Sequence, residues 1–364
     1  MARNALHLVV LPGDGIGPEI TAAAVAVLEA ASDRFGLGLR LEHEIAGHAS
    51  LARHGTTLRP ELLEKVQAAD GLVLGPMSTF DYTDESKGGI NPSMFFRKKL
   101  DLFANIRPAR TYPGIRHPAV EPFDLVVVRE NTEGFYADRN MEAGNAEMLV
   151  TPDVCVSLRR ITRPCCARIA RAAFRLAAAR RGRVHAVHKA NVLRMGDGMF
   201  LEECRRAAAD FPEVVMDEYI VDAMAAHLVR APGKFDVIVT TNMFGDILSD
   251  LTAELSGSIG LGGSVNAGER YAMAQAAHGS APDIAGQDRA NPFSLILSTA
   301  QLLDWQAERL GSPAFAAAGR AIEAAVAEAV AAGEITPDIG GHLGTSATGR
   351  AVVARLRVPP GGAG

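Results

Sequence analysis

The segment NMFGDILSDLTAE at residues 242–254 carries the sharpest chemical signal in the sequence. Asp246 and Asp250 are four residues apart in it, so a helix would place both carboxylates on one face. Like charges at that spacing repel each other and therefore favour a bound cation. Carboxylate oxygens suit Mg²⁺ or Mn²⁺, and Asp222, after the run VVMDEYIV, could supply a third ligand. A solvated acidic face is the alternative interpretation, and the position just after a buried strand weakens it.

Three arginines fall in segments with different expected conformations. Arg97 lies in an expected helix, whereas Arg107 precedes a proline and so favours extended backbone. Arg129 follows the apolar run DLVVV, where a charge needs a partner. Because the guanidinium fork matches carboxylate geometry, three converging arginines would suit a substrate with two or more carboxylates. Taken singly, each arginine is better explained as a surface charge or a structural ion pair.

Two further side chains have the chemistry of proton transfer. Lys189 ends the expected strand VHAVHK, which is where open α/β sheets place reactive groups. Partial burial there would lower its pKa toward that of a usable base. Tyr136 follows in a polar loop after Arg129, although a lone loop tyrosine is most often a packing residue.

Two segments have the composition of nucleotide-binding loops. GDGIGPE at residues 13–19 follows an expected strand and opens a helix, the position of a phosphate-binding loop. Its spacing is GxGxG and not the GxGxxG of a Rossmann fingerprint, so a tight turn with positive φ explains it equally well. HGSAPDIAGQDRANP at residues 278–292 offers backbone N–H groups, a histidine and a carboxylate, but its composition also fits an inert loop.

The composition excludes several classes of protein. With 364 residues, 48% hydrophobic and 22% charged, the chain is an ordinary globular protein of the size of two domains or one large α/β unit. A net charge of −5 gives no basic surface for nucleic acid, and no apolar window reaches the roughly 18 residues of a membrane span. The four cysteines fit no zinc or iron–sulfur spacing. We therefore expect a cytoplasmic protein without a nucleic-acid or membrane partner.

These residues must be positioned by alternating strands and helices, because short apolar runs alternate with helical patterns along the chain. This alternation predicts an α/β fold. The expected strands cover 6–11, 39–45, 71–75, 124–130, 184–189, 214–221 and 235–241. The expected helices cover 20–35, 60–69, 158–181, 197–209, 222–230, 244–256, 292–310 and 314–332. The glycine-rich stretch 257–268 is the expected crossing between domains.

Six segments together resemble the β-decarboxylating dehydrogenases, which act on isocitrate, homoisocitrate, 3-isopropylmalate, tartrate or D-malate. In family order these segments are LPGDGIGPE, DLFANIRPAR, RENTEGFY, HKANVLR, TTNMFGDILSD and HGSAPDIAGQDRANP. The resemblance implies an isopropylmalate-dehydrogenase-like two-domain α/β fold that is not a true Rossmann fold. It also implies a large cofactor-binding domain of residues 1–102 and 257–364, and a small central domain, 103–256, with a homodimer interface.

The same resemblance assigns roles to individual residues. Tyr136 and Lys189 are the expected catalytic residues, with Lys189 and Asp222 reaching the active site of the partner subunit. The expected metal ligands are Asp222, Asp246 and Asp250. The expected substrate-binding residues are Arg97, Arg107, Arg129, Asn91, Ser93, Met94, Asn191 and Asp222.

The implied reaction is the oxidative decarboxylation of a 3-substituted (2R)-malate to a 2-keto acid, CO₂ and NADH, with Mg²⁺ or Mn²⁺. Asp283 matches the position that faces the adenosine ribose, where a carboxylate accepts from both hydroxyls and repels a 2′-phosphate. Relatives that use NADP have lysine and then tyrosine where this chain has Asp283 and Ile284, so NAD is expected. The expected cofactor-binding residues are Gly75, His278, Gly279, Ser280, Ala281, Pro282, Asp283, Ile284 and Asn291.

The substrate's C3 substituent is less well defined. Asn91 and Ser93 are polar and Met94 is apolar, a combination that departs from both the isopropylmalate and the isocitrate patterns. It favours a polar or small substituent slightly over isopropyl. The alternative function is a non-catalytic regulatory or structural paralogue. An ordinary Rossmann 2-hydroxy-acid dehydrogenase conflicts with the missing GxGxxG.

Overall fold

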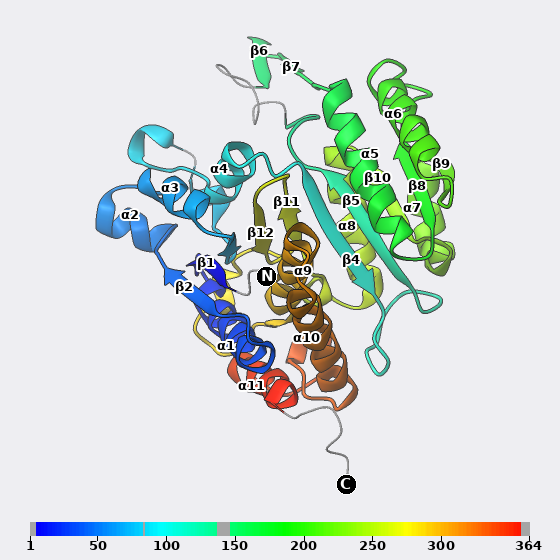
Figure 1. Ribbon diagram of the computed structural model, residues 1–364. Helices are drawn as coiled ribbons and strands as arrows, with labels where there is room; N and C mark the ends of the chain where they lie inside the picture. Colours follow the sequence, from blue (N-terminus) through cyan, green and yellow to red (C-terminus); the bar gives the residue numbers. More distant parts are fainter. Residues whose placement is uncertain (1–4, 83, 137–145, 358–364) are drawn as a thin grey trace. The chain divides into compact units, whose positions relative to one another are not determined.

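The computed structural model describes residues 5–82, 84–136 and 146–357, and the chain divides into two compact units (Figure 1). The first unit comprises Met1–Leu100, Tyr112–His117 and Gly257–Gly364, and the second comprises Asp101–Thr111 and Pro118–Ser256. The expected domains differ from these units at residues 101–102 and 112–117. The chain returns to the first unit at the start of the glycine-rich stretch 257–268.

The first unit is built on strands in the order β2-β1-β3-β12-β11, in which β2, β1, β3 and β12 pair in parallel and β11 pairs antiparallel with β12. Its strands are β1 (Leu6–Leu11), β2 (Leu39–His43), β3 (Gly71–Leu74), β11 (Val265–Ala267) and β12 (Ala272–Gln275). Its helices are α1 (Gly17–Phe35), α2 (His48–His54), α3 (Glu61–Ala68), α4 (Pro92–Lys99), α9 (Phe293–Leu310), α10 (Pro313–Ala331) and α11 (Thr345–Arg357). Helix α9 packs on β11 and β12 and is largely buried.

The second unit has strands in the order β4-β5-β10-β8-β9, with β4 antiparallel to β5 and the others parallel. These strands are β4 (Ala104–Arg110), β5 (Asp124–Glu130), β8 (Arg183–His188), β9 (Val215–Ile220) and β10 (Val237–Thr240). The helices are α5 (Arg163–Ala178), α6 (Gly196–Asp210), α7 (Val221–Arg230) and α8 (Asn242–Ser256).

Side-chain alternation along β5 creates two cores in the second unit. Val126 and Val128 pack with residues of α5 and α6, whereas Leu125 and Val127 pack with residues of α7 and α8. This is the two-residue period of a strand covered on both faces. Because β5, β10 and β8 run in parallel, the residues at their carboxyl ends, including Arg129 and Lys189, lie along one edge of the sheet.

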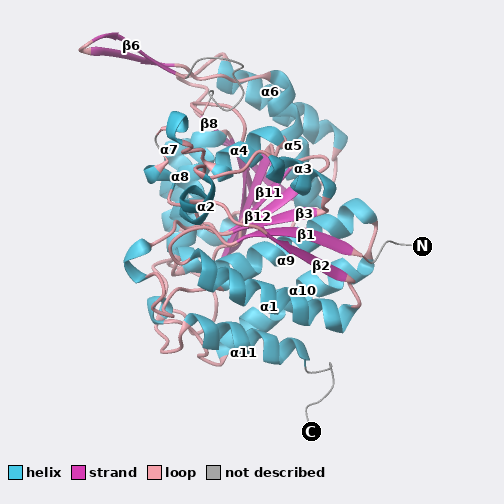
Figure 2. Cartoon of the chain, turned by 90° about the vertical axis from the view of Figure 1, so that its left-hand side faces the viewer, coloured by secondary structure: helices cyan, strands magenta, loops and turns pink. Residues whose placement is uncertain are grey.

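A separate hairpin consists of β6 (Glu147–Thr151) and β7 (Val154–Ser157). Figure 2 shows it extending away from the helices of the second unit. Its exposed side chains are largely apolar, including Met148, Leu149, Val154 and Val156. A two-stranded hairpin has no core of its own, and an exposed apolar surface of this kind is typical of a contact site for another protein surface.

The observed elements differ from the expected ones in a few places. Helix α5 begins at Arg163 and not at 158, because Thr162 caps it by accepting from the backbone N–H of Cys165 and a proline occupies its first turn. Strands β11 and β12 and helices α2 and α11 were not expected from the sequence. In the described part of the chain, no helix combines the length and the apolar character needed to cross a membrane.

Candidate active site

Two arginines on neighbouring strands meet the acidic residues of α8. Arg129 on β5 lies opposite Asn105 on β4, and Arg107 follows two residues later on β4. The guanidinium of Arg129 is buried, pairs with Asp246, and donates from Nε and Nη2 to Oδ1 of Asn242 at 2.9 and 2.7 Å. The charge that the sequence placed at the end of an apolar strand therefore has its partners on α8.

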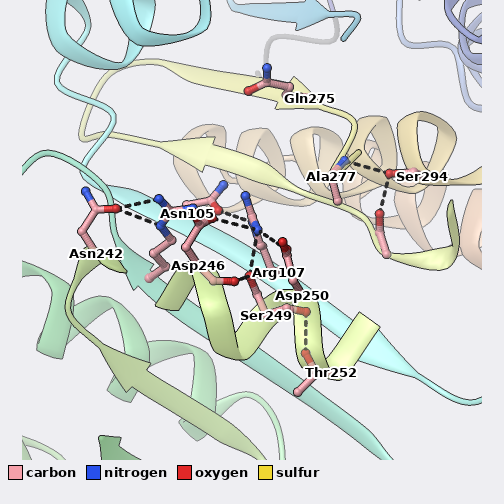
Figure 3. Close-up of polar contacts among 12 residues, drawn as sticks. Asn105, Arg107, Asn242, Asp246, Ser249, Asp250, Thr252, Gln275, Ala277 and Ser294 are labelled. Carbon is pink, nitrogen blue, oxygen red and sulfur yellow. Dashed lines mark hydrogen bonds and ion pairs between the residues drawn. The ribbon is translucent and has the colours of Figure 1, made fainter. Parts of the chain in front are cut away.

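The Arg107 side chain is held along the same helix (Figure 3). Its Nε donates to Oδ1 of Asn105 at 2.6 Å, and its Nη1 donates to Oγ of Ser249 at 2.7 Å. The same Nη1 lies 3.1 Å from Oδ1 of Asp250 and 3.5 Å from Oδ1 of Asp246. Arg107 therefore bridges the two carboxylates that the sequence placed on one helical face.

Helix α8 can approach the strand this closely because of Gly245. A Cβ atom at this position would lie 2.6 Å from both Cβ and Cγ of Arg129, closer than carbon atoms pack. The glycine therefore allows Asn242 and Asp246, on either side of it, to reach the guanidinium. Desolvation raises the pKa of Asp250 more than the Arg107 guanidinium lowers it, and the charge of Asp246 adds to the increase.

Tyr136 belongs to the same group of residues. Its hydroxyl donates to Oδ2 of Asp246 at 3.2 Å, and the Arg129 guanidinium lies 5.7 Å from the centre of its ring. Predicted catalytic, metal-binding and substrate-binding residues are thus joined within one unit.

The turn that leads to Tyr136 is fixed by two buried glutamates. The carboxylate of Glu130 accepts from the backbone N–H groups of Thr132 and Glu133. The carboxylate of Glu133 accepts from the backbone N–H and the hydroxyl of Thr162 at 3.0 and 2.9 Å, and burial raises its pKa. Gly134 follows with a φ of 87°, which a glycine adopts without strain. The glutamates of the RENTEGFY segment thus hold the backbone that carries Tyr136.

Lys189 and Asp222 form a second group at the same sheet edge. Lys189 directly follows β8, and its backbone N–H donates to Oδ2 of Asp197 at 2.6 Å. Its ammonium pairs with Asp222 in the first turn of α7, and this hydrogen bond lowers the pKa of the Asp222 carboxyl. Asn191 follows as an exposed residue. The pair is open to solvent, because Asp222 is 68% exposed.

The predicted substrate residues of the first unit lie on α4. Asn91 caps this helix by accepting from the backbone N–H of Met94 at 3.1 Å. Ser93 and Arg97 both donate to Oε1 of Gln275, each at 3.1 Å. The sequence did not point to Gln275 because it ends a four-residue strand, β12, that shows no alternation of apolar and polar residues.

The glycine-rich loop after β1 organises the predicted cofactor segment of the first unit. The backbone N–H of Ile16 donates to the carbonyl of Ser280 at 2.9 Å, and a side chain at Gly15 would collide with that carbonyl. Asp14 in this loop accepts from the backbone N–H groups of His48 and Ser78. The GDGIG segment is therefore a turn that joins loops of its own unit, as the positive-φ interpretation predicted.

The segment 278–291 combines local contacts with hydrogen bonds to other segments of the first unit. Burial lowers the pKa of His278, whose Nδ1 lies 3.0 Å from the carbonyl of Gly279. Pro282, Asp283 and Ile284 form a 3₁₀ turn on which Asp283 is exposed. Asn291 is buried and donates to Oδ2 of Asp338 at 3.1 Å.

Two more predicted cofactor residues have structural constraints of their own. Gly75 directly follows β3, and a Cβ atom there would collide with the carbonyl of Pro12. Ala281 has a φ of 36°, in the left-handed region that non-glycine residues rarely adopt. Such strain is typical of functional loops.

Comparison with known proteins identifies close relatives. The family model described as isocitrate/isopropylmalate dehydrogenase matches residues 7–352. An isocitrate/homoisocitrate dehydrogenase of Thermus thermophilus is 41% identical, over 97% of this chain and 99% of the relative. A 3-isopropylmalate dehydrogenase of Methanothermobacter thermautotrophicus is 40% identical, over 94% of this chain and 96% of the relative.

The structural comparison agrees with the sequence comparison. The crystal structure of isocitrate dehydrogenase from Methylococcus capsulatus matches with a TM-score of 0.85 and 38% identity, over 97% of this chain and 100% of that chain. The expected fold class, an α/β fold like that of isopropylmalate dehydrogenase and not a true Rossmann fold, is thereby confirmed.

Proposed function

The chain belongs to the isocitrate/isopropylmalate dehydrogenase family, and from this premise we propose that it is an NAD-dependent, metal-requiring dehydrogenase. The reaction is the oxidative decarboxylation of a 3-substituted (2R)-malate to a 2-keto acid, CO₂ and NADH. The observation that carries the proposal is the joined group Arg107, Arg129, Tyr136, Asp246 and Asp250 in the second unit.

Arg107 and Arg129 provide binding groups for substrate carboxylates. Beside their ion pairs with the carboxylates of α8, both guanidiniums are oriented by neutral groups, Asn105 and Ser249 for Arg107 and Asn242 for Arg129. A pre-oriented guanidinium loses little conformational entropy when it binds a carboxylate. Arg97 of the first unit has the same role by its match to the family motif.

The donor set on α8 fits a hard divalent cation. Mg²⁺ and Mn²⁺ bind through one or two protein carboxylates and leave positions for substrate and water, and Asp246 and Asp250 supply two. In the described residues no group of three or more potential ligands is present. In this proposal the substrate, water and Asp222 of the partner subunit supply the further ligands. When bound, the cation supplies polarisation of the C2 oxygen during both oxidation and decarboxylation.

Two side chains move protons in this proposal. Lys189 would help to remove the proton of the C2 hydroxyl as C2 is oxidised. Loss of the C3 carboxylate as CO₂ then leaves an enolate, whose carbon Tyr136 protonates. The hydrogen bond from the Tyr136 hydroxyl to Asp246 supports this role because it places the phenol beside the predicted metal ligand.

NAD is proposed as the cofactor because of Asp283. Its carboxylate is exposed on the 3₁₀ turn and would repel the 2′-phosphate of NADP. The chemistry that NAD supplies when bound is acceptance of the hydride. An Asp283→Lys variant should lose selectivity for NAD over NADP, and kinetics with both cofactors measure this.

We further propose a homodimer in which Lys189 and Asp222 complete the active site of the partner subunit. The second unit has exposed apolar side chains that could form the dimer interface. They lie on the hairpin β6–β7 and, as Val229 and Ile247, on α7 and α8. All four cysteines are free, which supports a reducing cytoplasmic location.

The test is NADH formation by the purified protein with NAD and Mn²⁺. The panel contains isocitrate, homoisocitrate, 3-isopropylmalate, D-malate and tartrate, each with and without EDTA. We expect one preferred acid and loss of turnover with EDTA. No turnover on any acid would contradict the proposal, and turnover unaffected by EDTA would contradict the metal assignment of Asp246 and Asp250.

A further inference from the structure

Gln275 at the end of β12 is in contact with two predicted substrate-binding residues. Its Oε1 accepts from Oγ of Ser93 and from Nη2 of Arg97, each at 3.1 Å. Ser93 and Arg97 are four residues apart on α4 and so lie on one face of the helix. A single carbonyl oxygen thus accepts hydrogen bonds from side chains on two successive turns of α4.

The orientation of the Gln275 amide follows from its partner. A guanidinium only donates hydrogen bonds, so the oxygen of the amide must face Arg97 and the NH₂ group must face away from that contact. The side chain is 8% exposed. Its backbone N–H donates to the carbonyl of Ser264 at 3.1 Å, and its own carbonyl accepts from Oγ of Ser298 at 3.0 Å. Gln275 is therefore an immobilised acceptor.

The neutrality of this acceptor matters for binding. A carboxamide orients a guanidinium without adding negative charge, so it does not compete with an anionic ligand for Arg97. A carboxylate at the same position would accept the same two hydrogen bonds. It would also form an ion pair with Arg97 that a substrate carboxylate must displace.

We propose that Gln275 is a positioning residue for substrate binding, which orients Arg97 and Ser93 through a neutral acceptor and adds no negative charge beside the guanidinium. This inference rests on the proposed function, in which Arg97 binds a substrate carboxylate. It assigns to Gln275 an effect on the affinity for the acid and little effect on hydride or proton transfer. The affinity for NAD should not depend on it.

Two substitutions at Gln275 separate this role from simple packing. Gln275→Met keeps the length of the side chain and removes the acceptor. Gln275→Glu keeps the shape and both hydrogen bonds and adds a charge. If Gln275 only packed or braced α4, the Glu variant would behave like the wild type. The matched control is Gln301→Met, which changes a glutamine of α9 outside the proposed machinery.

The measurements are the Kd of the preferred acid by calorimetry, steady-state KM and kcat, and the melting temperature of each full-length variant. We expect Gln275→Met to raise the Kd and KM of the acid about tenfold, the size of one hydrogen bond to a charged group. Gln275→Glu should raise them further at an unchanged melting temperature. For both Gln275 variants, kcat and the KM for NAD should stay within about twofold of the wild type. For Gln301→Met, the Kd, both KM values and kcat should all stay within the same range.

A double-mutant cycle with Arg97→Lys shows whether Gln275 acts through Arg97, because the effect of Gln275→Met should then shrink in the Arg97→Lys background. An active wild type with a Gln275→Glu variant that binds the acid equally well would overturn this inference alone. So would a fall in kcat at unchanged Kd. A wild-type protein that neither binds nor oxidises any acid of the panel would overturn the proposed function and this inference with it.

Discussion

The two groups of predicted catalytic residues in the second unit differ in how deeply their charged side chains are buried and in how many partners they have within the chain. In the group around α8, Arg129 of β5 is 2% exposed and shares Asp246 of α8 with Arg107 and Tyr136. After β8, Lys189 and Asp222 pair with each other while their side chains are 28% and 68% exposed. The first group is thus assembled by neighbouring elements of one chain. The second is an open pair of charges, as expected for residues that complete a site on another subunit.

The difference has an energetic basis. A buried guanidinium must be paired and hydrogen-bonded, so the α8 group is needed for stability as well as for chemistry. An exposed ion pair contributes little to stability, and it can exchange partners at low cost. Substitution of a residue that pairs with the buried Arg129 should therefore damage the fold, whereas substitutions in the second group should damage only the reaction.

The largest effect is expected for Lys189→Ala. Loss of the group that removes the hydroxyl proton should lower kcat by about 10³-fold, within the range for general acid–base residues. The melting temperature should stay close to that of the wild type because the lost ion pair is exposed. Steady-state kinetics and thermal unfolding measure both effects, with Lys87→Ala as the control at an exposed lysine. A Lys189→Ala enzyme within tenfold of the wild type would contradict the assignment.

Smaller effects are expected for the two aspartates of α8, on the metal dependence of the rate for both and on stability for one of them. Both Asp246→Asn and Asp250→Asn should raise the Mn²⁺ concentration needed for half-maximal rate by at least about tenfold. Only Asp246→Asn should also lower the free energy of unfolding, by about 1–3 kcal/mol, because it removes a carboxylate that pairs with the buried Arg129. Metal titration of the rate and urea unfolding separate these effects. Equal stability of the two variants would show that Arg129 does not depend on Asp246.

The smallest effect is expected for Asp304, which belongs to neither group of site residues, and it concerns the pH dependence of stability. Burial raises the pKa of Asp304 on α9 to about 7, with Glu323 adding to the shift and Arg320 opposing it. The folded state therefore favours the protonated form, so the stabilising contribution is complete below the unfolded pKa near 4 and is lost as the pH rises through 7. Partial exposure limits the loss to about 1–2 kcal/mol.

Asp304→Asn should remove this part of the pH dependence and leave kcat unchanged. Urea unfolding between pH 4 and pH 8 measures it, and Asp33→Asn on the exposed side of α1 is the matched control. A wild-type stability curve that Asp304→Asn does not flatten would show that Asp304 titrates near its ordinary value.

Much of the fold follows from sequence patterns. Strand β5 was predictable from its continuous apolar run, and helix α8 from apolar residues at helical spacing. The sequence predicted that Arg129 has a partner, because a buried charge requires one, but it did not predict that the partner lies on α8. Strands β11 and β12 were missed because three and four buried residues give no period. Hairpin β6–β7 is exposed along its length and has no buried face to set a pattern.

The supporting residues of the site were harder to predict than the charged ones. Asn242 orients Arg129 and donates to the carbonyl of Glu133 at 3.0 Å, yet in the sequence it is only one polar residue at the start of a helix. Gln275 acts across 178 positions of the chain from Arg97. The Lys189–Asp222 pair joins residues 33 positions apart. Such contacts are set by strand order and helix packing, which the one-dimensional pattern does not contain.

Mixing two inactive variants tests the division between the two groups most directly. Lys189→Ala and Asp246→Asn are each purified, then unfolded and refolded together, and NADH formation is compared with that of each variant refolded alone. If the two groups complete one active site across two subunits, half of the randomly formed dimers contain one intact site of two, and the mixture recovers up to about a quarter of the wild-type activity. If the mixture stays as inactive as its components while the wild type survives the same treatment, Lys189 and Asp246 serve the same site from a single chain, and the shared active site is contradicted.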